Sequence, residues 1–249
     1  MRTLIRGLAA AAIAGSLIVG ATATVAAAER HAASVPDYAM VRVLDAMVGA
    51  GPLDVYVSRV AEGTPPTYAD IAFGAATGYE KLYFTPDCTG KSTCNLEFEV
   101  AEHGKDTPFK SSMVALAGGT HATVVLASTA STGPIFDEYA DSTRATAKSS
   151  LRFVNVTSTT VTPIDVSAIA MTGTGTVTAT DLGFAQATRA QSTKPGDWNI
   201  QFRATGSMGM ALPWTNAVLK KGYHYTAYFI GELGGVGEAA ARFVLLPNR

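Results

Sequence analysis

Histidines and carboxylates are the side chains of this sequence most able to bind a metal or to move protons. The four histidines are His31, His103, His121 and His224. A zinc site needs several ligands at close spacing, and a calcium loop needs a run of oxygen ligands. No histidine pair has metal spacing and no acidic segment resembles a calcium loop, so we expect no metal. His121 and His224 each begin a run of strand-forming residues, where we expect them to face solvent or to form hydrogen bonds.

Two aspartates, Asp54 and Asp165, stand in apolar stretches at matching places in the two halves of the chain. A carboxylate in an apolar strand costs free energy unless it is partnered or exposed. A catalytic pair would have to lie within roughly 5–10 Å, which equivalent residues of separate domains seldom do. We therefore expect a hydrogen bond to a neighbouring loop, or a solvated acid, with Arg42 and Arg152 as candidate ion-pair partners. No residue is predicted to be catalytic.

Aromatic residues of the second half are the candidate ligand-facing residues, namely Trp198, Trp214 and Tyr228. By offset, the two tryptophans fall at Cys94 and Ser111 of the first half, which carry no ring. Aromatic rings offer a broad apolar face with a polar edge, so a glycan-binding platform is one interpretation. The alternative is that Trp198 covers a hairpin and that neighbouring rings belong to the core.

Glycine-rich segments give no evidence of a cofactor. Residues 235–240 (GVGEAA) superficially match a dinucleotide-binding loop, but that site needs a following helix, a second strand and a distant acid. Too little sequence remains for these elements. Residues 206–209 (GSMG) lack the spacing of a nucleophile elbow. We expect a turn at 235–240, no nucleophile elbow at 206–209 and no cofactor.

Cys88 and Cys94 flank a Thr-Gly-Lys-Ser-Thr segment. In an exported chain this spacing favours a disulfide that staples a loop. A redox pair would usually be Cys-x-x-Cys, and a metal site would need further ligands close in sequence. We predict a structural disulfide.

The chain contains an internal repeat, which indicates that one unit is built twice. Residues 41–57 match 151–168, with Arg42 aligned to Arg152. Residues 116–123 match 219–226 at a shorter offset, so the first unit is longer in the middle, where the cysteines lie. These matches predict a first repeat at 35–140, a linker at 141–147 and a second repeat at 148–249.

Within each unit the pattern predicts strands. Short runs rich in Val, Ile, Thr, Tyr and Phe are separated by Gly, Pro and Asp. Val41 and Val43 share one face and Arg42 points away from it, as expected where one side of a sheet meets a core and the other meets water. About seven strands per hundred residues predict an all-β chain with two tandem immunoglobulin-like β-sandwich domains. An enclosed barrel is the alternative.

The matching blocks resemble the bacterial secreted family called domain of unknown function 4397. The resemblance rests on Val41–Val57, Ile71–Tyr79, Leu116–Leu126, Leu151–Ile169, Asp181–Ala185 and Leu219–Ile230. Members commonly carry His-Ala-Ser-Pro-Asp after the first strand, whereas this chain has DAMVG at 45–49 and NVTST at 155–159. The resemblance implies a sandwich-like fold, tandem repeats and export. It implies no activity, so no functional residue is carried over.

The N-terminus has the order of a secretory signal peptide. Arg2 and Arg6 precede an apolar run at 8–25, and small residues at 26–28 suit a signal peptidase. An uncleaved anchor is the alternative, since the run is about long enough to span a bilayer. Its Ala- and Gly-rich composition makes insertion weak. We predict a signal peptide at 1–28 and a mature form that does not span the membrane, in the periplasm or outside the cell.

Composition limits the function further. The 249 residues are 47% hydrophobic and 16% charged, with a formal net charge of −1. This argues against a nucleic-acid partner and against disorder. We expect an exported, non-catalytic envelope or extracellular protein that binds or scaffolds, with a cell-envelope glycan or another envelope protein as its partner. The alternatives are a carbohydrate-binding module using aromatics of the second repeat, and an exported hydrolase with a site between the domains.

Overall fold

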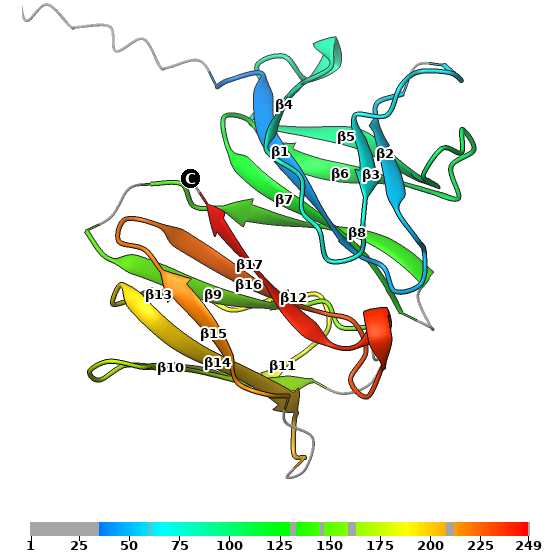
Figure 1. The fold of residues 1–249 in the computed structure, drawn as a ribbon. Coiled ribbons are helices and arrows are strands. Elements are labelled where there is room, and N and C mark those ends of the chain that lie inside the picture. Colours follow the sequence, from blue (N-terminus) through cyan, green and yellow to red (C-terminus); the bar gives the residue numbers. More distant parts are fainter. Residues whose placement is uncertain are drawn as a thin grey trace, which may run out of the picture. The chain divides into compact units, whose positions relative to one another are not determined.

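The computed structural model describes residues 35–59, 61–129, 133–144, 147–158, 163–207 and 212–248, and the regular secondary structure in these ranges is almost entirely β-strand (Figure 1). The all-β fold class is therefore confirmed. The signal peptide predicted for 1–28 lies outside the described residues. Within the described ranges, no helix has the length and apolar character needed to cross a bilayer.

The first half, residues 35–144, forms two four-stranded sheets with the orders β4-β1-β7-β8 and β3-β2-β5-β6. Its strands are β1 (Tyr38–Ala46), β2 (Leu53–Val57), β3 (Tyr68–Ile71), β4 (Glu80–Tyr83), β5 (Thr93–Glu102), β6 (Lys110–Ala117), β7 (His121–Thr129) and β8 (Gly133–Asp141). Alternate residues of both sheets, such as Val41, Val43 and Phe98, meet in one apolar core. The two sheets thus make a sandwich. Because β8 extends to Asp141, the first residue of the expected linker belongs to a strand.

The second half, residues 147–248, has the same strand order, β12-β9-β16-β17 and β11-β10-β14-β15, with β13 also paired to β9. Its strands are β9 (Ser149–Asn155), β10 (Ile164–Ala170), β11 (Thr176–Leu182), β12 (Gln186–Ala187), β13 (Gln191–Thr193), β14 (Gly196–Ala204), β15 (Thr215–Leu219), β16 (His224–Ile230) and β17 (Arg242–Asn248). Trp198, Ile200 and Phe202 of β14 pack against Phe153 and Phe229 in a second core.

Two strand pairs are parallel, whereas the other pairs within the described sheets are antiparallel. The first strand of each half, β1 or β9, lies parallel to β7 or β16. This register places Arg42 beside Thr123 and Arg152 beside Thr226. The narrower immunoglobulin-like assignment stays a prediction.

The outer faces of the β1 and β9 sheets are buried against each other. We call this contact the junction; its apolar part is formed by Leu44, Ala46, Val125, Ala127, Tyr139, Val154, Val156, Tyr228 and Ile230. The expectation that the second face of these sheets meets water was therefore wrong. Both faces of β1, β7, β9 and β16 are covered, so the apolar cluster of the junction lies between the cores of the two sandwiches. The lower and upper sandwiches of Figure 1 meet along these strands.

The two cysteines form the predicted disulfide. Cys88 ends a short 3-10 turn, η1 (Pro86–Cys88), and Cys94 lies at the start of β5. Their Cα atoms are 5.4 Å apart. Both side chains are buried at the edge of the first core, so the bridge attaches the loop before β5 to that core.

Replacing both cysteines by serine is expected to lower the free energy of unfolding by about 2 kcal/mol, because the short closed loop restricts the unfolded chain. Urea unfolding of oxidised protein and of Cys88→Ser/Cys94→Ser measures this difference. Adding a reductant should affect the oxidised protein and leave the variant unchanged. Equal stability of the two oxidised samples would show that the bridge does not stabilise the fold.

Candidate functional site

A buried polar cluster lies in the junction and is built from equivalent residues of the two halves. In the first half Arg42 Nε donates to Thr123 Oγ1 (2.9 Å), and in the second Arg152 Nε donates to Thr226 Oγ1 (2.8 Å). Each arginine then crosses into the other half. Arg42 Nη1 donates to the Pro247 carbonyl at 2.9 Å, and Arg152 Nη1 to the Ala140 carbonyl at 2.7 Å. The contact is reciprocal, as in an interface with two-fold symmetry.

The symmetry fails at one pair of positions. β8 places Asp141 opposite His121, and β17 places Asn248 opposite His224, so Asp141 and Asn248 are equivalent. Asp141 Oδ1 accepts from Arg152 Nη2 at 2.9 Å, and its Oδ2 lies 3.4 Å from Arg42 Nη2. Arg42 Nη2 also donates to Asn248 Oδ1 at 2.6 Å. Two guanidinium groups thus share a single carboxylate, whose side chain is 0% exposed.

This cluster corrects the ion-pair expectation. Arg42 and Arg152 do not pair with Asp54 and Asp165 but converge on Asp141, which the sequence analysis assigned to a linker. The repeat aligned the two arginines, and the sequence carried no signal that they exchange partners across the halves. The cluster is structural, because its polar atoms bond one another and Arg42 is only 4% exposed.

Asp54 and Asp165 have the structural role that the sequence analysis favoured. Asp54 Oδ1 accepts from the backbone N–H of Asp70 at 2.9 Å, and Asp165 Oδ1 accepts from that of Asp181 at 3.1 Å. Asp70 and Asp181 have φ of 54° and 57°, a region that non-glycine residues rarely occupy. The buried Asp54 therefore stabilises the irregular backbone where β2 meets its neighbouring strand. The half-buried Asp165 does the same for β10.

The first half adds a histidine to this arrangement. His103 Nδ1 lies 2.9 Å from Asp54 Oδ1, and the N–H of Gly104 donates to Asp54 Oδ2 at 3.0 Å. Burial opposes ionisation of Asp54, but the hydrogen bonds from His103 and two backbone amides together hold its pKa below the ordinary value. The hydrogen bond that His103 donates to Asp54, together with the negative charge of Asp54, raises the pKa of His103. Thr205 takes the place of His103 in the second half and donates to Asp165.

His103 is expected to titrate above the ordinary histidine range in a pH series of NMR spectra. Asp54→Asn should bring the pKa of His103 back down, whereas Asp165→Asn, the matched change in the other half, should not. The ion pair is complete between the lowered pKa of Asp54 and the raised pKa of His103, and it is lost as the pH rises through the latter. An unchanged His103 titration in Asp54→Asn would contradict this assignment.

His121 and His224 do not form a shared site. The His121 ring packs edge-on against Tyr79 with ring centres 5.1 Å apart. His224 Nδ1 forms a short hydrogen bond with Ser150 Oγ, and its Nε2 lies 2.7 Å from the Arg144 carbonyl. The Ser150–His224 pair was not predicted. Ser150 is 8% exposed, and neither residue lines any of the cavities described below, so this pair fixes the start of β9 and β16.

The three candidate aromatic residues are not gathered at one surface. Trp198 is 2% exposed, and its Nε1 donates to the Lys194 carbonyl at 3.0 Å. Tyr228 is fully buried in the junction, edge-on to Tyr139. The prediction of a ligand-facing position was therefore wrong for both residues, because alternation along β14 and the junction turn them inward. Trp214, at 45% exposed, is the one that remains at the surface.

The register also corrects the position assigned to Trp198. Trp198 pairs with Ala217 on β15, as Leu96 pairs with Val114 on β6. Its counterpart is thus Leu96 and not Cys94. Trp198 is a core residue at a core position, which explains why its ring is unavailable.

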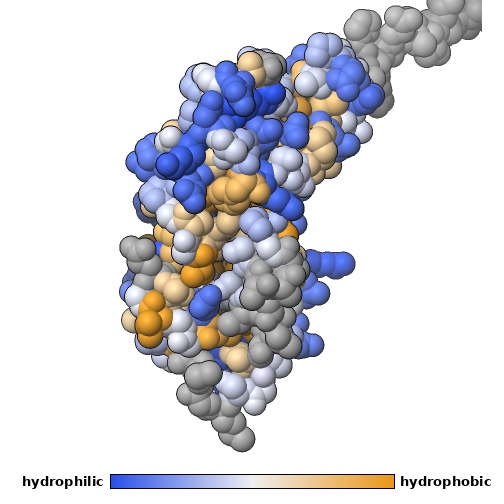
Figure 2. Space-filling view, turned by 90° about the vertical axis from the view of Figure 1, so that its right-hand side faces the viewer, coloured by the Kyte–Doolittle hydropathy of each residue, from blue (hydrophilic) through white to orange (hydrophobic). Residues whose placement is uncertain are grey.

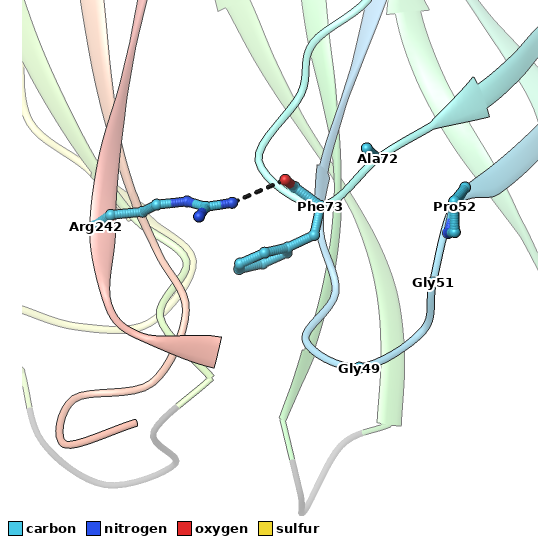
Figure 3. A pocket seen from close by; sticks show the side chains of 6 residues that line it. All are labelled: Gly49, Gly51, Pro52, Ala72, Phe73 and Arg242. Atoms are coloured by element: carbon cyan, nitrogen blue, oxygen red, sulfur yellow. Dashed lines mark hydrogen bonds between the residues drawn. The ribbon is translucent and has the colours of Figure 1, made fainter. Parts of the chain in front are cut away.

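A cavity of about 460 Å³ lies between the halves, at the end where β17 begins. Figure 3 shows Phe73 and the Gly49–Pro52 loop of the first half facing Arg242 of the second. Arg242 Nη2 donates to the Phe73 carbonyl at 2.8 Å, and the guanidinium lies 4.6 Å from the centre of the Phe73 ring. The lining consists mainly of the Arg242 guanidinium, the Phe73 ring and the backbone of the Gly49–Pro52 loop. It could hold a small ligand but contributes no general base.

Two smaller hollows follow the start of β17 within the second half. One, of about 160 Å³, is lined by Ile200, Phe202, Leu212, Pro213, Thr215, Ala241, Arg242 and Phe243. The other, of about 270 Å³, is lined by Ala204, Leu212, Leu233, Gly234, Gly235, Ala240 and Ala241. On the side of the molecule shown in Figure 2, hydrophilic residues prevail over the upper part and hydrophobic residues form separate patches lower down. Neither hollow contains a histidine or a carboxylate.

Among the described residues, no group of three or more His, Cys, Asp or Glu side chains is arranged to hold a metal. The segment 235–240 forms a turn with a short 3-10 element, η2 (Gly237–Ala239), before β17. The expected turn is thus found there.

Comparison with known proteins places the chain in a family. A family model described as domain of unknown function (DUF4397) matches residues 39–167, which cover the first half from Ala39 onward, all of β9 and the first part of β10. A search of curated proteins gave no match. Among solved structures, a leucine-rich repeat protein from Bacteroides thetaiotaomicron VPI-5482 is 9% identical, with a TM-score of 0.23 over 79% of this chain and 26% of that one. This chain thus spans about a quarter of that protein. The family match, which covers more than half of the sequence, shows that the chain belongs to the DUF4397 family.

Proposed function

We propose that this protein is an exported, non-catalytic component of the cell envelope or extracellular space that binds or scaffolds another envelope component. The observation that carries the proposal is the junction. An apolar contact and a reciprocal arginine cluster join the two sandwiches through buried side chains. Such a body presents the outer faces of the β2 and β10 sheets at a fixed spacing, which suits a scaffold or a binding protein.

The junction also weighs against the hydrolase alternative. That alternative requires a cleft between the halves with His121 or His224 near an acid. His121 lies opposite Asp141 in the ladder, but that carboxylate is buried and bound by the two arginines, and the His121 ring packs on Tyr79. His224 bonds Ser150 and a carbonyl. The cavity between the halves has Arg242 as its charged residue. The lining of this cavity therefore favours the binding of a small ligand and provides no group for proton transfer.

Export is supported by the disulfide, since such bridges persist in oxidising compartments. Fractionation of host cells, followed by mass spectrometry, tests it. We expect the mature protein to begin at Glu29 and to carry a Cys88–Cys94 bridge. Recovery of a reduced, full-length chain in the cytoplasm would contradict the proposal.

Co-sedimentation of the mature protein with purified cell envelopes of its host tests the binding role. We expect saturable pelleting that native protein competes for and heat-unfolded protein does not. Absence of pelleting at micromolar protein would overturn the envelope-binding role. Enzyme turnover in the same preparation would favour the hydrolase instead.

A further inference from the structure

The outer face of the β11-β10-β14-β15 sheet carries a group of uncharged hydrogen-bonding side chains, interrupted in its second row by the exposed Ile169. Trp198, Ile200 and Phe202 of β14 point into the core, so Asn199 and Gln201 point outward. The same alternation on the other strands completes the set. We call it the amide face, formed by Ser167, Thr176, Thr178, Asn199, Gln201 and Asn216, with Trp214 at its edge.

The strand register brings these residues together in two rows. In one row, Ser167 lies opposite Thr178 on one side and Gln201 on the other. In the next row, Asn199 lies between Ile169 and Asn216. Neighbouring side chains in such rows are about 5 Å apart, so donors and acceptors repeat at short intervals across three strands.

Trp214 borders the row that contains Gln201. It directly precedes Thr215, whose partner Ile200 directly precedes Gln201, so Trp214 lies just beyond the end of the ladder on the side of Gln201. Gln201 Nε2 donates to the Leu212 carbonyl at 2.9 Å and thus holds the segment before β15 against the sheet. Trp214 is 45% exposed. A large ring therefore lies beside ordered amides.

The equivalent face of the first half has different chemistry. Asp54 and Asp165 set the comparison, since they pair with Ala101 and Arg203 on the neighbouring strands. Counting back along those strands, Glu99 corresponds to Gln201 and Glu97 corresponds to Asn199. The partners on the edge strands correspond as well, with Ser111 in the place of Trp214 and Met113 in that of Asn216. On the same scaffold, two carboxylates are replaced by carboxamides and a serine by tryptophan.

We infer that the amide face binds a neutral polysaccharide, an inference that rests on the proposed binding role and names its ligand. Sugar hydroxyls both donate and accept hydrogen bonds. Carboxamides and hydroxyls do the same, whereas a carboxylate only accepts. The apolar face of a pyranose ring matches the exposed ring of Trp214, which has a broad apolar surface and a polar N–H.

The charges around the face favour an uncharged ligand. The two central rows contain no charged side chain. At one end Arg203 lies 3.8 Å from Asp165 and is balanced by it. At the other end Asp197 is exposed and would repel an anionic polymer. A neutral chain incurs no such repulsion and loses no counterions on binding.

Binding of the mature protein to cellulose and chitin particles, and its retardation in gels containing a neutral β-glucan or galactomannan, tests the inference. We expect saturable binding to at least one of these four polymers. Raising NaCl from about 0.05 to about 0.5 M should leave it unchanged, because screening acts on charges. No binding to any of the four, or binding abolished by salt, would overturn the inference.

Matched variants locate the surface. Trp214→Ala should weaken binding about tenfold, through the lost ring contact. Asn199→Glu/Gln201→Glu, which copies the first half, should abolish it, and the reverse change Glu97→Gln/Glu99→Gln should not reduce it. Asn216→Ala provides a milder test if the double variant fails to fold, and circular dichroism checks folding in each case. Binding that survives both Trp214→Ala and Asn216→Ala would overturn the assigned surface.

The outcome can be separated from that of the proposed function. Envelope pelleting that persists in Trp214→Ala and in the glutamate variant would keep the binding role and remove the amide face from it. Polysaccharide binding without envelope pelleting would keep the amide face as a polysaccharide site and remove the envelope-binding role.

Discussion

Replacing Asp141 by asparagine is expected to lower the free energy of unfolding by about 3–5 kcal/mol, the usual cost of breaking a buried ion pair. Asp141 is the carboxylate between Arg42 and Arg152, and its Oδ2 also accepts from Thr123 Oγ1 at 2.5 Å and Tyr79 Oη at 2.7 Å. The amide removes the carboxylate that a buried guanidinium (Arg42) and a partly buried one (Arg152) share. Such a loss is a large part of the stability of most proteins. Urea unfolding measures it, with the exposed Asp197→Asn as a control.

The pseudo-symmetry of the junction gives a sharper form of this experiment. Asn248 occupies the place of Asp141 in the other half and already accepts from Arg42 at 2.6 Å. The exchange Asp141→Asn/Asn248→Asp keeps one carboxylate between the two arginines, so it should recover part of the stability lost in Asp141→Asn. If the exchanged protein is no more stable than the single variant, the cluster does not act as a symmetric unit. A loss below about 1 kcal/mol in Asp141→Asn would contradict the cost itself.

The sandwiches were predictable because their signals are local. Alternation in β1 and β14 separates core residues such as Val43 and Ile200 from outward ones, and glycines and prolines mark the turns. The spacing of Cys88 and Cys94 was enough to predict their bridge. The internal match of Arg42 with Arg152 indicated two equivalent units, and the two halves have the same strand order.

The junction was missed because it depends on how two folded units meet. One signal for it was available. β7 and β16 are apolar at successive positions, as in Val124, Val125 and Leu126, which is typical of strands covered on both faces. Reading those strands as half-exposed placed Arg42 in water and Tyr228 among surface residues. Which carboxylate the two arginines share could not be inferred, because Arg152 reaches Asp141 only after the halves dock.

The candidate surface was predictable only in part. Trp214 was selected as an aromatic residue without a counterpart, and it is exposed. Asn199 and Gln201 belong to no recognisable sequence motif. Their difference from the first half becomes visible only when the strand register aligns them with Glu97 and Glu99. Side-chain type alone could not separate Trp214 from Trp198, since the difference between them is strand parity.

Asp45 carries the second large effect. It lies at the end of β1 and is fully buried. Its Oδ1 accepts from the Met47 N–H at 2.8 Å, whereas no donor among the described residues reaches Oδ2. Burial raises the pKa of Asp45 to about 7, against the smaller opposing effect of the Met47 hydrogen bond. Below about pH 7 the folded protein therefore holds a proton on most of these carboxyl groups.

The second half shows what that proton does. Asn155 is the equivalent of Asp45: its Oδ1 accepts from the Thr157 N–H at 3.0 Å, and its Nδ2 donates to the Leu182 carbonyl at 2.8 Å. The Oδ2 of Asp45 occupies the place of that amide nitrogen. A protonated Asp45 can donate where an ionised one cannot. Asp45→Asn should therefore supply the missing donor at every pH.

The pH dependence of the stability follows from the upward shift of the Asp45 pKa. The folded chain keeps the proton up to about pH 7, whereas the ordinary value is 3.8. Stability is thus complete below about pH 4, falls as the pH rises from 4 to 7, and is constant above that range as far as Asp45 is concerned. A difference of this size corresponds to about 4 kcal/mol. Asp45→Asn should match the natural protein at pH 4 and exceed it by about 2–4 kcal/mol at pH 8.5.

Urea unfolding of the natural protein and of Asp45→Asn at several pH values isolates this contribution, because all other titrating groups are shared. Asn155→Asp is the matched change in the second half. Whereas Asp45→Asn removes a pH-dependent loss of stability, Asn155→Asp should add one. The stability lost in Asn155→Asp should grow between pH 4 and 7. If the difference between the natural protein and Asp45→Asn stays constant with pH, Asp45 is not protonated in the fold. In that case its Oδ2 must have a partner, and the equivalence with Asn155 would be limited to Oδ1.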